Sequence, residues 1–239
     1  MFSSRFISWV CPDLLHCPSG LPRSILASMA PAQANQSILA GFQVLQEVIT
    51  AAQPLGSREV ARRMGLEHSR VNRILGTLAT AGMLQQNSDT KYYPGPGLHA
   101  LSALSLHASG LIPAALPVLE PFHAEGATVA LGTLWKDTIV YLLHANPSQD
   151  LPSSAGAHEN YPKEKSVLTR VLEPGCPEFV QMEREDTGEM TFAVRVGSRG
   201  TLAVGIVYPL GHPGLTNIDG LAQKVLQAGR KIARAIGSE

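Results

Sequence analysis

Basic and polar side chains recur along one predicted helix of this 239-residue chain. The stretch from His68 to about Ala81 places apolar residues at helical spacing, which predicts a helix with one buried face. The opposite face carries Arg70, Asn72 and Arg73. Arginine can fork onto guanine, asparagine can bond adenine, and either residue can hold a phosphate. This face therefore predicts a surface that reads DNA.

A shorter helix precedes this segment and a β-hairpin follows it. The shorter helix is expected to start at Ser57 as its N-cap and to end at Gly65. Residues 83–93 alternate around an Asn-Ser-Asp turn, which predicts a hairpin. Two helices joined by a tight turn and followed by a hairpin have the layout of a winged helix-turn-helix. The expected DNA contacts are Ser57, Arg58, His68, Ser69, Arg70, Asn72, Arg73, Thr77 and Lys91.

The predicted reader is basic in a chain that is neutral overall. Five arginines and two glutamates lie between Arg58 and Arg73, whereas the whole chain has 19 basic and 19 acidic residues. This balance argues against non-specific coating of nucleic acid and leaves a local patch. Ser69, at the start of the second helix, is expected to direct its hydroxyl and a free backbone N–H at a phosphate. The alternative interpretation is a solvated pair of helices with arginines outside.

The order of these segments resembles that of the IclR-type bacterial transcriptional regulators. The resemblance rests on SREVARRMGLEHSRVNRILGTLATAGML (57–84), on a wing ending in YYPGPGLHAL (92–101) and on a leading helix from Ser37 to Ala52. The spacing in that leading helix predicts a buried stripe of Ile38, Phe42, Leu45 and Ile49, with Val48 beside it. The implied organisation is a leader over 1–34, a DNA-binding domain over 35–97, a linker helix over 98–112 that helps pair two subunits, and an effector domain over 113–239.

The leader does not have the pattern of a folded domain. Residues 1–28 contain apolar residues without periodicity and three prolines, and Asp13 and His16 interrupt any signal-peptide core. We expect translation to start at Met29.

The C-terminal part predicts an α+β domain with an antiparallel sheet that carries helices on one side. A helix from Pro113 is followed by hairpins within 127–145 and 191–209 and by a last helix from Ile218. The resemblance implies a shortened GAF-like ligand sensor, in which a segment is missing between Leu172 and Cys176. Its ligand set is carried over weakly, because Ile206 and Tyr208 stand where relatives often have serines.

A small organic acid is the effector that the resemblance implies, with Lys163, Lys165 or Arg195 neutralising its carboxylate. The expected effector contacts are Leu131, His144, Lys163, Lys165, Glu185, Arg195, Ile206 and Tyr208.

Patterns of catalytic and metal-binding residues are missing from the sequence. The eight histidines are scattered, and neither a metalloprotease, a hydrolase-elbow nor a phosphate-loop pattern occurs. Cys11, Cys17 and Cys176 imply neither a disulfide framework nor a zinc site. No apolar run approaches the roughly 20 residues of a membrane span. The sequence predicts a cytoplasmic protein that is not an enzyme and has no cofactor or membrane partner.

Two functional hypotheses follow from these patterns. The first is a homodimeric or homotetrameric regulator that binds a double-stranded DNA operator, responds to a metabolite and represses or activates a catabolic operon. Pairing is expected because one small reader makes few contacts, whereas a two-fold dimer reads two half-sites. The second is a non-catalytic assembly module that uses the winged helix and a degenerate sensor for protein contacts.

Overall fold

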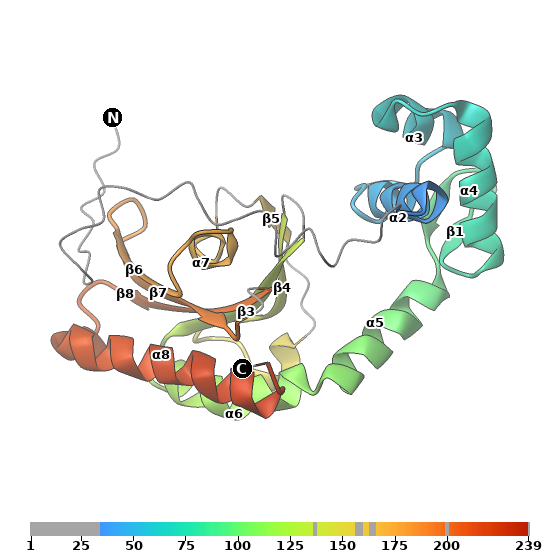
Figure 1. Cartoon of the computed structure of the whole chain (residues 1–239). Coiled ribbons are helices and arrows are strands. Elements are labelled where there is room, and N and C mark those ends of the chain that lie inside the picture. The colour runs from blue at the N-terminus through green and yellow to red at the C-terminus, as the bar shows by residue number, and fades with distance from the viewer. Residues whose placement is uncertain (1–33, 136–137, 156–159, 163–165, 199–200, 239) are drawn as a thin grey trace. The chain divides into compact units, whose positions relative to one another are not determined.

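The computed structural model describes residues 34–135, 138–155, 160–162, 166–198 and 201–238 (Figure 1). These residues form two compact units, with the division between Ser105 and Leu106. The predicted start at Met29 and all of the predicted leader except Ala34 lie outside the described residues.

The N-terminal unit has the predicted order of helices and strands. Its core joins Val44 and Val48 of the first helix to Val71 and Leu75 of the third. Backbone bonds between Leu55 and Tyr92 attach the wing to the segment before the second helix. The elements are α2 (Gln36–Ile49), α3 (Ser57–Met64), α4 (His68–Thr80), β1 (Leu84–Gln86), β2 (Tyr92–Pro94) and α5 (Pro96–Ser109), which crosses the division between the units.

The buried stripe of α2 differs from the prediction. Ala40, Val44, Leu45 and Val48 are buried. Ile38, Phe42 and Ile49, which were predicted to be buried, are exposed. The stripe is therefore turned around the helix axis, because the smaller valines fit against α4 while larger residues face outward. The exposed large apolar side chains of α2 are Ile38, Leu39, Phe42 and Ile49.

Two helix ends explain how α3 and α4 turn against each other. Gly56 is the N-cap of α3 and makes no side-chain capping bond, so the prediction of Ser57 as N-cap was wrong by one residue. Gly65 ends α3 with a φ of 62°, a left-handed conformation that glycine adopts without a Cβ clash. Only two residues, Leu66 and Glu67, then separate Gly65 from α4.

The C-terminal unit is built on a six-stranded antiparallel sheet with the order β5-β4-β3-β8-β7-β6. The predicted hairpins are present as β3–β4 and β7–β8, whereas strands β5 and β6 were not predicted. The elements are α6 (Leu111–Ala124), β3 (Thr128–Trp135), β4 (Thr138–Ala145), η1 (Pro152–Ser154), β5 (Asn160–Pro162), α7 (Thr169–Leu172), β6 (Phe179–Arg184), β7 (Glu189–Val196), β8 (Leu202–Pro209), η3 (Pro213–Asn217) and α8 (Ile218–Ala235).

The long helices α6 and α8 cover one face of the sheet, as predicted (Figure 1). The short helix α7 packs on the other face, which the sequence pattern did not indicate. A β-bulge in the pairing of β3 with β4 also divides the apolar residues of this hairpin between the two faces of the sheet. Leu131 and Leu143 join the core under α6 and α8, whereas Ile139 joins the cluster under α7.

No single helix in the described part of the chain is both long and apolar enough to cross a membrane. Only α5 and α6 taken together, as a bent pair, meet that criterion by length and composition.

Candidate functional site

The first turns of α3 and α4 meet at one end of the helix-turn-helix. The hydroxyl of Ser57, the first residue of α3, lies 2.9 Å from Nε2 of His68, the first residue of α4. Both helices therefore present the positive ends of their dipoles in the same region. The two residues were predicted as DNA contacts, and the structure brings them together by binding them to each other.

One exposed face of α4 gathers the side chains that were predicted to read DNA. Ser69, Asn72 and Arg73 are exposed and Arg70 is half-buried. The spacing of these residues places them on adjacent turns, while Val71 and Leu75 are fully buried on the opposite side. These four residues of α4, together with the exposed Arg58 in the first turn of α3, are called the reading face below.

Two of the five arginines in this region are neutralised within the unit. Arg62 and Arg63 both bind Glu59, with the shortest nitrogen–oxygen distance 2.7 Å in each pair, and Arg63 also reaches Glu47 of α2 at 3.1 Å. Hydrogen bonds from Arg62 and then Arg63 lower the pKa of Glu59 to about 2. Arg63 thus links α3 to α2, whereas Arg62 is paired within α3.

The guanidinium groups of the reading-face arginines are available to bind a partner. Among the residues that the structure describes, Arg58, Arg70 and Arg73 form no ion pair. Because two other arginines already balance nearby acids, the positive potential of the helix-turn-helix is concentrated at these three positions.

Two hydroxyls of the predicted set have other partners in this structure. Ser69 donates to the carboxylate of Glu67 at 2.5 Å, and its contact with a phosphate stays a prediction. Thr77 donates to the backbone carbonyl of Arg73 at 2.9 Å, a local bond common for threonine inside a helix. Neither hydroxyl hydrogen is available to DNA in this state.

Glu67 was not predicted as a site residue, although it immediately precedes α4. It is the N-cap residue of that helix, makes no capping bond, and is exposed. Its position gave no distinctive signal in the sequence, since an acidic residue at a helix N-terminus is favourable in any protein.

The wing holds the last predicted contact, Lys91. The side-chain oxygen of Asn87 accepts from the backbone N–H groups of Asp89 and Lys91, and Thr90 between them has a φ of 59°. This turn leaves Lys91 exposed just before β2. Its ammonium group forms no ion pair within the described ranges.

Three predicted effector contacts belong to the hydrophobic core of the C-terminal unit. Leu131, Ile206 and Tyr208 are 0% exposed and lie in the cluster beneath α6 and α8. Burial raises the pKa of Tyr208 to about 12, and the hydroxyl reaches Glu125 at 3.4 Å. The prediction that these residues face a ligand is wrong, because strand alternation turns them toward the helices.

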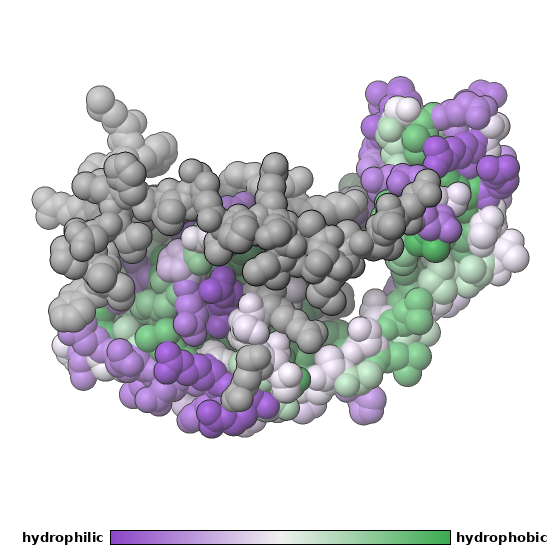
Figure 2. All heavy atoms as spheres, viewed as in Figure 1, coloured by the Kyte–Doolittle hydropathy of each residue, from purple (hydrophilic) through white to green (hydrophobic). Residues whose placement is uncertain are grey.

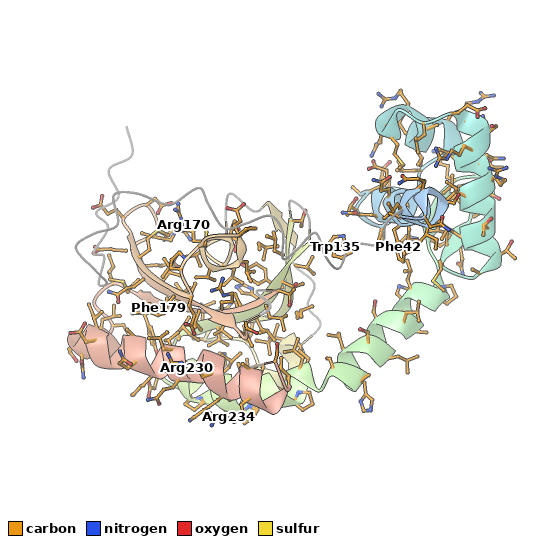
Figure 3. All side chains as sticks on the ribbon, in the orientation of Figure 1. Phe42, Trp135, Arg170, Phe179, Arg230 and Arg234 are labelled. Carbon is orange, nitrogen blue, oxygen red and sulfur yellow. The ribbon has the colours of Figure 1, made fainter. Side chains whose placement is uncertain are left out.

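The other predicted effector residues that the structure describes lie on three separate segments of the C-terminal unit. His144 lies 5.3 Å from Tyr141 between ring centres, whereas Glu185 is exposed in the turn between β6 and β7. Arg195 lines a cavity of about 340 Å³ with Arg230 and Arg234 of α8, which Figure 3 labels. Lys163 and Lys165 lie outside the described residues.

The sheet face under α7 is the face opposite to the one that α6 and α8 cover. Leu168 packs against Gly132 and Gly205, where an added Cβ would approach its methyl groups to 2.8 and 3.1 Å. On the same strand face as Ala193, which joins the α7 cluster, Thr191 is buried, and its hydroxyl has no hydrogen-bond partner among the described residues. Tyr141 and Ser166 form a hydrogen bond of 2.9 Å beside this cluster.

A comparison with family models matches residues 37–88 to the IclR helix-turn-helix domain. The chain is also 29% identical over 107 residues to the HTH-type transcriptional regulator BhcR of Paracoccus denitrificans. That alignment spans 44% of this chain and 38% of the relative, so it covers well under half of each protein.

Solved structures share the fold at low sequence identity. An IclR family regulator from Brucella abortus aligns with a TM-score of 0.67 and 17% identity, covering 86% of this chain and 96% of that protein. A putative IclR regulator from Silicibacter sp. TM1040 aligns with a TM-score of 0.66 and 16% identity, covering 85% of this chain and 97% of that protein. An IclR homologue from Microbacterium hydrocarbonoxydans complexed with 4-hydroxybenzoate aligns with a TM-score of 0.55 and 17% identity, covering 85% of this chain and 100% of that protein.

Proposed function

Because this chain carries the IclR helix-turn-helix domain and has the fold of IclR-family regulators, we propose that it is a sequence-specific, double-stranded DNA-binding transcriptional regulator. The observation that carries the proposal is the reading face. Arg70 and Arg73 project from an exposed helix face without an ion-pair partner in the described part of the chain, beside the exposed amide of Asn72. These side chains have the donor geometry for base edges and phosphates in a major groove.

A gel shift of the full chain on DNA flanking its own gene tests this function. With excess competitor DNA, the expected result is a retained band whose affinity falls steeply as salt is raised, because phosphate contacts release counterions. Absence of a shift at low salt would contradict the proposal and favour an assembly module.

A second copy of the chain is the partner that we propose for the N-terminal unit. The α2 residues Ile38, Phe42 and Ile49 are 57%, 62% and 45% exposed and fall within about 40° around the helix. Helix α5 buries none of its residues, and Leu101 and Leu104 are 54% and 65% exposed. Figure 2 shows the hydrophobic residues along α5, and Figure 3 shows Phe42 on α2. Apolar faces of this kind are typical of subunit contacts.

Replacing Phe42 or Leu104 by aspartate is expected to convert the proposed dimer to a monomer, because each variant places a charge in an apolar contact. Light scattering after size exclusion measures the mass, with Gln43→Asp as the matched control on the exposed polar side of α2. Binding to DNA with two half-sites should fall with the loss of the dimer. A Phe42→Asp, Leu104→Asp double variant that remains dimeric would contradict this interface.

We further propose that a small organic acid modulates DNA binding through the C-terminal unit. The support is the shared fold with a homologue complexed with 4-hydroxybenzoate, together with the buried hydroxyl of Thr191 on the α7 side of the sheet, which has no hydrogen-bond partner among the described residues. If the ligand binds one arrangement of two readers more tightly, it changes operator affinity by the same factor as DNA changes ligand affinity. Whether the regulator represses or activates a catabolic operon depends on the position of the operator.

A further inference from the structure

The carboxylate of Glu67 lies beside the reading face and has no cation partner in the part of the chain that the structure describes. Glu67 is the N-cap residue of α4, and its carboxylate accepts a hydrogen bond from Ser69 at 2.5 Å. This bond places the carboxylate beside Ser69, which belongs to the reading face.

The other acids of the helix-turn-helix are arranged differently. Glu59 is bound by Arg62 and Arg63, and Glu47 is bound by Arg63. Their charges are therefore balanced inside the unit. Glu67 alone, among the described acids from α2 to α4, keeps an unbalanced negative charge on the surface that would meet DNA.

The phosphates of DNA repel a carboxylate, and a hydrogen bond that the carboxylate accepts from a base offsets part of this repulsion. In the major groove the base donors are the amino groups of cytosine and adenine. The adenine amino group lies beside the N7 acceptor, whose lone pair repels a carboxylate, whereas cytosine presents its N4 amino group alone. A glutamate at the leading end of a reading helix is thus matched to cytosine, since the N-terminal residues of such helices contact base edges.

We propose that Glu67 is a specificity-determining residue that accepts a hydrogen bond from the amino group of one cytosine in each half-site, with Ser69 positioning its carboxylate. This inference rests on the proposed DNA-binding function. Arg70, Asn72 and Arg73 then supply the attraction and the other base contacts, and Glu67 excludes the three wrong bases at its position.

The test is selection of the full chain on a randomised DNA library, followed by titration of the enriched sequence with single-base changes. The wild-type chain is expected to enrich one C·G pair per half-site and to lose about 5- to 150-fold in affinity when that pair is changed. Glu67→Gln should shift the preference at that pair toward A·T, because glutamine bonds both N6 and N7 of adenine. Ser69→Ala should keep the cytosine preference and reduce its size.

Asp89→Asn is the matched control, because Asp89 is an exposed acid in the wing turn, distant in sequence from the reading helix. It should raise affinity for all sequences by a similar factor and leave the preference unchanged. If Glu67→Gln does the same, Glu67 is only a repulsive charge and the inference is overturned. A wild-type chain that enriches no sequence would overturn the proposed function itself, whereas enrichment without the cytosine would overturn only the role of Glu67.

Discussion

Replacing Arg70 and Arg73 together by alanine is expected to lower operator affinity at least about 30-fold, since each arginine at a base or phosphate contributes roughly 1–3 kcal/mol. Both side chains belong to the exposed face of α4, and neither has an ion-pair partner within the described residues. Their removal therefore leaves no buried charge behind in the free protein. Fold and oligomeric state should be unchanged by circular dichroism and light scattering.

Fluorescence anisotropy with a labelled operator measures this loss. The slope of log affinity against log salt should also decrease by about one for each phosphate contact removed. The matched control is Arg62→Ala, whose side chain is 73% exposed but already paired with Glu59. Because that charge is balanced within α3, we expect a much smaller change in affinity. Equal losses from Arg62→Ala and from the double variant would contradict the assignment of the reading face.

The second large effect is expected from Tyr208→Ala, which should destabilise the C-terminal unit by about 3–5 kcal/mol. Tyr208 is 0% exposed and is among the largest fully buried side chains. Its ring lies 4.7 Å from that of His212 between centres, and it belongs to the core between the sheet and α6 and α8. Truncation would leave a cavity that the surrounding strands and helices cannot close.

Calorimetry of the full chain measures this effect as a fall of about 10–20 °C in the transition of the C-terminal unit. Tyr208→Phe is the control, because it keeps the ring and removes only the 3.4 Å bond to exposed Glu125. That bond is long, so its loss should cost about 1 kcal/mol or less. A Tyr208→Ala variant with an unchanged transition but an altered response to ligand would show that Tyr208 faces an effector.

Local patterns were sufficient for most of the helix-turn-helix. The boundaries of α3 and α4 follow from helical spacing and from Gly65, and the turn between β1 and β2 follows from Asn87; each signal acts over a few residues. The stripe of α8 was also predictable, with Leu221, Val225, Ala228 and Ile232 all buried. In both cases neighbours in the sequence determine the conformation, so the residue types suffice.

Which face of an element is buried depended on distant partners. The periodicity of α2 is compatible with two neighbouring stripes, and contact with α4 selects Val44 and Val48 over Phe42. In the sheet, the bulge in the β3–β4 pairing decides which residues lie under α7. The alternation on β8 does not reveal which face α8 covers, and for this reason Tyr208 was assigned to the wrong side.

The sequence by itself determined that this protein has a basic helix-turn-helix with a wing, followed by an α+β unit, because these features arise from short-range spacing and turn chemistry. The tertiary structure alone decided which charges are free to bind a partner and which are paired within the protein. Arg62 and Arg63 are balanced by acids on α2 and α3, Ser69 is bound to Glu67, and the reading arginines are unpaired in the described structure. Charges pair through space, so a count along the chain cannot show which of them face a partner.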